Sequence, residues 1–180
     1  MTSGPPAGPA GLSIWPVTGL PEVRPGDDLA ALLVAGLSAS GLALRDGDVL
    51  VVSSKVMSKA LGLIRTGTTR ADAVADQTRR VVARRRGPVA DTVIVEAAAG
   101  PVMAAAGADS SNARPGEVLL LPEDSDAQAR RLRARVTDLA HGVVFGLVIA
   151  DTAGRMVGLG DYRPGKGGGH GRYSTAVTVL

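Results

Sequence analysis

The chain has 180 residues, of which 45% are hydrophobic and 21% charged, as in one globular domain or two small ones and unlike a disordered protein. No window approaches the ~20 apolar residues of a membrane span, so a soluble protein is expected. The absence of cysteine excludes disulfides, thiolate metal sites and cysteine nucleophiles, and two histidines leave little for a histidine-based metal site. Any metal is therefore expected to be held by oxygen atoms.

The net charge of +3 and the pI of about 9.8 raise the question of nucleic-acid binding. One Trp, two Tyr and one Phe offer few platforms for stacking on bases. Basic residues concentrate in "TRRVVARRRG" (78–87), which is interpreted as the solvated face of a helix. A small anionic ligand fits this charge as well as nucleic acid does.

Residues 1–11 are rich in proline and glycine and lack the basic and apolar regions of a secretion signal. They predict a disordered leader and a cytoplasmic protein. A short strand and a loop are expected next. Asp27 and Asp28 then indicate a helix start, because acidic side chains cap the free N–H groups and favour the helix dipole.

The run Val49 to Val52 is fully apolar and predicts a strand inside a sheet. A helix is predicted from about Ala71 to Arg86, and two strands are expected around Gly100-Pro101. The apolar residues on one side of the predicted 71–86 helix are Val74, Val81 and Val82.

After "EVLLLP" (117–122), a further helix is predicted with Ser125 or Asp126 as its N-cap. Its apolar face would comprise Ala129, Leu132, Val136 and Leu139. The segment 142–151 predicts a buried strand, and the terminal "TAVTVL" predicts a strand with an unpaired edge. Between these two strands, 158–171 is dense in glycine, and "GKGGGHG" (165–171) within it is interpreted as a flexible linker that exposes His170. This mixture of strands and amphipathic helices indicates an α/β or α+β fold.

Polar side chains follow three of the apolar runs. They lie in "SSKVMSK" (53–59), in "DSSN" (109–112) and in "DTAGR" (151–155). Ligand sites in α/β sheets gather at the carboxyl ends of strands. The three polar segments, called the polar tips of the strands, could therefore lie close together in the fold. Two carboxylates and a threonine hydroxyl could then hold Mg²⁺ or Mn²⁺, with lysines facing substrate phosphates. Taken singly, each tip is as readily explained by a turn, a cap or a surface lysine.

Five segments, in this order, resemble the coenzyme F420:L-glutamate ligase family and are similar to the ligase half of its bifunctional actinobacterial members. They are "PVTGLPEVRPGDDLA" (16–30), "LRDGDVLVVSSKVMSKALG" (44–62), "VMAAAGADSSN" (102–112), "VLLLPEDSDAQARRLR" (118–133) and "VIADTAGR" (148–155). The resemblance implies an α+β fold, with a ligase-like core over 12–155 and a shortened Gly-rich segment over 156–180. It also implies a homodimer.

The resemblance further implies that GTP phosphorylates a carboxylate of the coenzyme precursor and that glutamate then displaces the phosphate to form an amide. Metal ligands would be Asp109, Asp151 and Thr152, binding Mg²⁺ or Mn²⁺ as a two-metal site, and K⁺ is a further expected cofactor. Lys59 would be catalytic by stabilising charge on the transferred phosphoryl group. The residues expected to contact the nucleotide are Leu20, Pro21, Glu22, Val23, Ser54, Lys55, Lys59 and Asn112.

The chain also departs from the family pattern. Leu61 stands where the family has a glutamate, and a C-terminal loop with a further metal-ligating glutamate is expected to be missing, which would impair activity. One alternative is a degenerate member that binds nucleotide without ligating. Another is a basic nucleic-acid-binding module, for which the arginines of 78–87 and the pI are the evidence.

Overall fold

The computed structural model describes residues 11–87, 92–111, 113–153 and 173–179. The predicted leader lies almost wholly outside these residues, and the glycine-rich segment with His170 and the amide of Asn112 lie entirely outside them. The described residues mix four α-helices with eight strands in three small sheets, which confirms the α+β prediction. None of the described helices has the length and apolarity needed to cross a bilayer.

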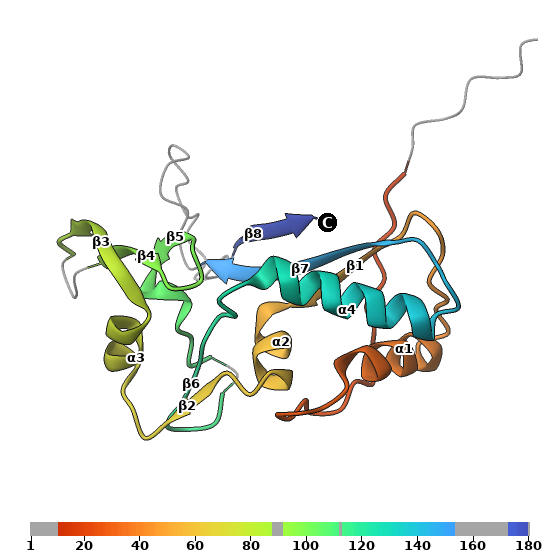
Figure 1. Ribbon diagram of the computed structural model, residues 1–180, viewed down its shortest axis with the longest axis horizontal. Helices are drawn as coiled ribbons and strands as arrows, with labels where there is room; N and C mark the ends of the chain where they lie inside the picture. The colour runs from red at the N-terminus through yellow and green to blue at the C-terminus, as the bar shows by residue number, and fades with distance from the viewer. Residues whose placement is uncertain (1–10, 88–91, 112, 154–172, 180) are drawn as a thin grey trace, which may run out of the picture.

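The main sheet has the strand order β1-β7-β8, from β1 (Val49–Ser53), β7 (Gly146–Ala153) and β8 (Tyr173–Val179). Strand β7 runs parallel to β1 and antiparallel to β8. Figure 1 shows α1 (Leu29–Ala39), α2 (Ser54–Ala60) and α4 (Ser125–Leu139) gathered on one side of this sheet. The strands predicted over 142–151 and at the C-terminus are therefore present.

The largest core lies between these helices and the sheet. Alternate residues of β1 and β7 point into it, because successive side chains of a strand face opposite sides. The fully or nearly buried members include Leu50, Val52, Leu132, Val136, Leu147 and Ile149. On the opposite side of β1, Val49 and Val51 remain 59% and 62% exposed.

The prediction that residues 49–52 lie inside a sheet is therefore wrong for the described part of the chain. There, β1 pairs with β7 alone and forms an edge. A continuous apolar run signals two apolar faces, but it does not reveal whether both edges are paired.

A second region is built from short elements. Strand β2 (Ile64–Thr66) pairs with β6 (Glu117–Leu119), and β3 (Thr78–Arg85) pairs with β4 (Thr92–Ala97), which pairs with β5 (Val102–Ala104). The one-turn 3₁₀ helix η1 (Ala105–Gly107) follows β5, and α3 (Arg70–Asp76) packs beside it. The two strands expected around Gly100-Pro101 are β4 and β5.

The helix predicted over 71–86 is wrong beyond its first two turns. It ends as α3 with Gln77 as C-cap, and the arginine-rich segment is the exposed strand β3. Thr78, Val81 and Val82 are β-branched and favour the extended conformation, so the apolar spacing that suggested a helix was ambiguous. The arginines accordingly lie on a strand and not on a helix face.

Three further predictions concern the start of α1, the start of α4 and the residues before position 20. The helix announced by Asp27 and Asp28 is α1, with Asp28 as N-cap, so that prediction is confirmed. The N-cap of α4 is Asp124, so neither Ser125 nor Asp126 caps it, because the Asp124 carboxylate accepts the N–H of Ala127. The strand expected before residue 20 is absent, since residues 11–20 show no regular structure.

Candidate functional site

A small pocket lies where the main sheet meets the second region. It is lined by Ser54, Lys55, Gly107, Asp109, Leu121 and Asp151, among others, and is called the Asp109 pocket. Its volume of about 10 Å³ leaves room for about one water molecule. The polar tips expected to converge do converge here, since α2, the segment after η1, and β7 each supply a polar residue.

The parallel register explains why two of these tips meet. Ser53 pairs with Ala150, so Ser54 and Asp151 follow side by side. Ser54 Oγ donates a hydrogen bond of 2.8 Å to Asp151 Oδ1. Ser54 is 2% exposed, so its hydroxyl is fixed in the interior and holds the carboxylate in one place.

Asp109 is held by its own loop. Its Oδ1 accepts the N–H of Ser111 at 2.7 Å and its Oδ2 accepts the Ser111 hydroxyl at 2.8 Å, so an Asx turn forms. The backbone of Asp109 bridges to Leu119, and Arg70 Nε donates to the carbonyl of Ala108. The turn interpretation is thus correct for residues 109–111, and the same turn aims a carboxylate into the pocket.

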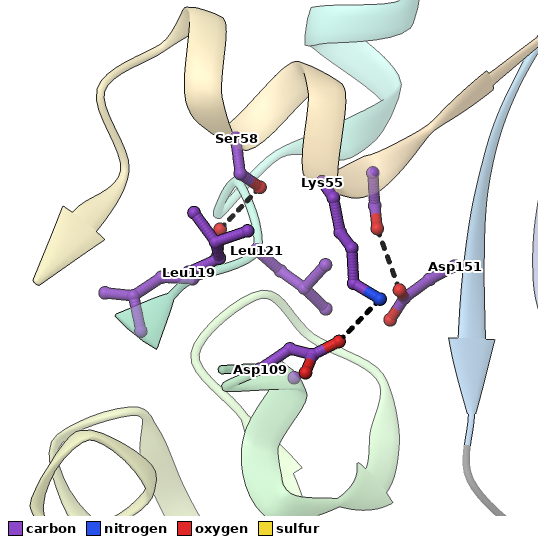
Figure 2. Close-up of a pocket in the computed structure, with 9 residues that line it drawn as sticks. Lys55, Ser58, Asp109, Leu119, Leu121 and Asp151 are labelled. Carbon is purple, nitrogen blue, oxygen red and sulfur yellow. Dashed lines mark hydrogen bonds and ion pairs between the residues drawn. The ribbon is translucent and has the colours of Figure 1, made fainter. Parts of the chain in front are cut away.

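Lys55 joins the two carboxylate-bearing segments. Its Nζ lies 2.7 Å from Asp109 Oδ2, and its side chain is only 13% exposed. Figure 2 shows the amine reaching toward Asp109, with the Asp151 carboxylate on its other side. Burial raises the pKa of the Asp109 carboxyl, but hydrogen bonds from Lys55 and Ser111 outweigh it and hold the pKa below its usual value. Asp109 is therefore ionised at neutral pH.

Lys59 lies one turn further along α2 and faces a different partner. Its Nζ forms an ion pair of 2.5 Å with Glu22, whose side chain is 69% exposed. Glu22 and Pro21 belong to a larger, shallow hollow of about 420 Å³ beside the start of α1, called the α1 hollow, which Arg24, Asp27 and Asp28 also line. Helix α2 thus connects the α1 hollow with the Asp109 pocket.

The remaining residues expected at the site contribute unequally. Val23 is buried in the main core, so only its backbone could reach a ligand, and the partly buried Leu20 packs against the same core. The side chain of Thr152, like the whole of Asn112, is outside what the structure describes. Gly107 lines the pocket and was missed, although a glycine just before a functional aspartate is a signal for a special backbone conformation.

Comparison with known proteins identifies the family. The sequence pattern of the F420-0:Gamma-glutamyl ligase family matches residues 19–168. The chain belongs to this family. It is 41% identical over 161 residues to the "Coenzyme F420:L-glutamate ligase" of Methanopyrus kandleri, 38% over 162 residues to that of Archaeoglobus fulgidus and 34% over 166 residues to that of Halorubrum lacusprofundi. Each match covers 80% of this chain and 61% of the relative, so the chain spans about three fifths of their length.

The oxygen donors of this family member fit a divalent cation such as Mg²⁺ or Mn²⁺. Such ions are commonly bound by one or two carboxylates together with waters and substrate phosphates. Asp109 and Asp151 supply two carboxylates at one pocket, and the ammonium of Lys55 already places a positive charge beside them. Within the described residues, no group of three or more acidic or histidine side chains is gathered, so the remaining ligands would have to come from elsewhere.

Proposed function

We propose that the chain carries the nucleotide- and metal-binding core of an enzyme that adds L-glutamate to the precursor of the deazaflavin coenzyme F420. Family membership supports the glutamate ligation. The observation that carries the finer proposal is the meeting of Ser54, Lys55, Asp109 and Asp151 at one pocket. These groups are suited to phosphoryl transfer, which depends mainly on positioning and on stabilising negative charge.

In this proposal, Asp109, Asp151 and Thr152 hold Mg²⁺ or Mn²⁺, as one or two ions. Bound there, the metal would neutralise charge on the phosphate oxygens. Ser54 keeps Asp151 oriented, and Ser111 keeps Asp109 oriented. Carboxylates that are fixed before substrates arrive need no reorganisation during the reaction.

GTP is proposed to bind along α2, with its nucleoside in the α1 hollow and its phosphates directed toward the Asp109 pocket. Pro21 and Glu22 line the hollow, and the backbones of Leu20 and Val23 belong to the same loop. Lys59 and Lys55 would face the phosphates, with Lys59 as the catalytic cation, and Asn112 would contact the nucleotide. K⁺ would assist as a further counter-ion.

The proposed reaction has two balanced steps. A carboxylate oxygen of the precursor attacks the γ-phosphorus of GTP, which forms an acyl phosphate and releases GDP. The amine of glutamate then attacks the acyl carbon, forms the amide, expels inorganic phosphate and loses a proton. Lys59 stabilises the charge that spreads over the phosphoryl oxygens in the first step.

A homodimer in the cytoplasm completes the proposal. The exposed side chains of Val49 and Val51 on β1 support a subunit interface, because burying apolar side chains against a second subunit removes them from water and is favourable. Measuring the mass of the purified chain in solution tests this assembly. A strictly monomeric chain at high protein concentration would contradict it.

The activity test incubates the chain with GTP, Mn²⁺, L-glutamate and the coenzyme precursor. We expect release of GDP together with a product heavier by one glutamate residue, at an impaired rate because the chain departs from the family pattern, and neither with Asp109→Asn. A full-length relative run in parallel gives the reference rate. Magnesium-dependent GTP binding without product would favour the degenerate, non-ligating member. Salt-sensitive binding to arbitrary DNA without GTP binding would favour the nucleic-acid module.

A further inference from the structure

Lys55 occupies an unusual position for a lysine. It lies in the first turn of α2, where the partial positive charge of the helix start disfavours a cation. Its side chain is nevertheless only 13% exposed, and its ammonium is paired with Asp109. A partly buried cation at the start of a helix is stabilised by a carboxylate partner, so the pocket explains the position of Lys55 better than the helix does.

Each of the two carboxylates accepts a hydrogen bond from a group other than Lys55. Asp109 is fixed by two hydrogen bonds from Ser111, and Asp151 is fixed by Ser54. These donors are neutral groups and would remain in place if the ammonium left. The pocket would then present two oriented carboxylates beside a vacated cation position.

The pocket is too small to be loaded as it stands. About 10 Å³ admits one water molecule, but not a divalent ion with its own waters and a phosphate oxygen. The aliphatic stem of lysine is long and flexible, so the ammonium can move without unfolding α2. Removing it frees both volume and carboxylate oxygens.

We infer that Lys55 holds the cation position beside Asp109 and Asp151 until a divalent ion displaces it, whereupon its ammonium turns toward the nucleotide phosphates. This inference rests on the proposed metal-dependent function. It adds that the ammonium of Lys55 competes with the divalent ion for the carboxylate oxygens. The metal and the lysine exclude each other at Asp109, so without metal the ammonium offsets one of the two carboxylate charges, and the lysine becomes available only when the metal has bound.

The first test measures Mn²⁺ affinity without nucleotide, from the electron paramagnetic resonance signal of free Mn²⁺. Lys55→Met keeps much of the stem but removes the competitor, so we expect affinity to rise about tenfold, an amount within reach of a partly buried ion pair. Lys59→Met is the matched control, because it removes the same charge one helical turn away, from an ion pair with Glu22. It should change the affinity by no more than about twofold. Adding Asp109→Asn to Lys55→Met should abolish the gain.

The second test uses the unaltered chain and so does not depend on a variant that folds. Lysine amines are labelled with acetic anhydride at fixed pH, with and without Mg²⁺, and quantified residue by residue by mass spectrometry. Labelling of Lys55 should rise severalfold with Mg²⁺, while that of Lys59 stays constant.

The possible failures are distinguishable. If no variant binds Mn²⁺, the metal-dependent function fails and the inference fails with it. If all variants bind Mn²⁺ with equal affinity and the labelling of Lys55 does not change with Mg²⁺, the inference alone is overturned. A rise in affinity of the same size in Lys59→Met would also overturn it, because general electrostatics would then explain the effect.

Discussion

Ser54 Oγ and Asp151 Oδ1, 97 positions apart in the sequence, are joined by a hydrogen bond of 2.8 Å at the end of β1. The contact follows from the parallel pairing of β1 with β7, which places Ser53 beside Ala150. A neutral hydroxyl thus orients a carboxylate without competing with a cation for its charge. The relationship makes Ser54 a positioning residue that can be tested separately from folding.

Ser54→Ala should weaken Mn²⁺ binding and Mn²⁺-dependent GTP binding severalfold. The lost hydrogen bond to a charged group should also lower the free energy of unfolding by about 1–3 kcal/mol. Calorimetric titration and urea unfolding measure the two effects.

Ser58→Ala is the control for this variant. Ser58 is equally buried on the same helix, but its hydroxyl donates to the carbonyl of Leu120 at 2.7 Å. It should lose about 1 kcal/mol of stability and keep its metal affinity. Equal losses of Mn²⁺ affinity in both variants would mean that Ser54 acts only through stability.

Lys59→Met should lower GTP affinity by about tenfold, because a charge-assisted contact to phosphate is lost. Thermal stability should hardly change, since an ion pair with the exposed Glu22 contributes little. Isothermal titration with GTP and Mg²⁺, together with a melting curve, provides the measurement.

Glu22→Gln serves as the comparison for Lys59→Met, because it breaks the same ion pair and leaves the lysine. GTP affinity should then stay constant or rise. Unchanged GTP binding in Lys59→Met would make Lys59 an ordinary surface lysine and remove it from the proposed mechanism.

The sequence predicted the meeting of Ser54 and Asp151 because that meeting follows from the topology of the main sheet, whereas Asp109 comes from the loop after η1 in the second region. The runs that became β1 and β7 were recognisable as apolar strands, and parallel strands end at the same edge. The helix α4 was predicted from a local pattern. Ala129, Leu132 and Val136 repeat at helical spacing, and all three are buried in the structure.

The sequence could not supply features that depend on tertiary contacts. The partner of Lys55 is 54 positions away, and no local pattern distinguishes it from Lys59, whose partner is Glu22. Strand β3 was mistaken for helix because a short apolar spacing fits both structures and pairing with β4 decided between them. The three-residue β2 is too short for any periodicity to appear.

Stability should fall as the pH drops below about 4, near the ordinary pKa of aspartate, in part because of Asp28. The N–H of Ala31 and the guanidinium of Arg135 hold the pKa of the Asp28 carboxyl below its usual value. A lowered pKa in the folded state means that the carboxylate stabilises the fold above the unfolded pKa. That contribution is lost as the pH falls through the folded pKa.

Asp28→Asn keeps an oxygen that can cap α1 but removes the charge. Melting temperatures measured between about pH 2 and pH 6 should therefore fall less steeply with acid than those of the unaltered chain. Arg135→Met should produce part of the same flattening, and high salt should reduce the difference. Identical acid profiles for Asp28→Asn and the unaltered chain would contradict the contribution of Asp28.

Gly107→Ala should damage both stability and metal binding. Gly107 has a φ of +73°, and a Cβ there would lie 2.3 Å from Leu121 Cδ1, so strain and a clash add together. Gly116 has a φ of +81° with open space around it and is the matched control. In urea unfolding, Gly116→Ala should cost about 1 kcal/mol and Gly107→Ala about 2–4 kcal/mol. Mn²⁺ affinity should fall only in Gly107→Ala, because that loop aims Asp109. Equal losses of unfolding free energy in the two variants would show that the Leu121 side chain moves aside easily and that Gly107 does not shape the pocket.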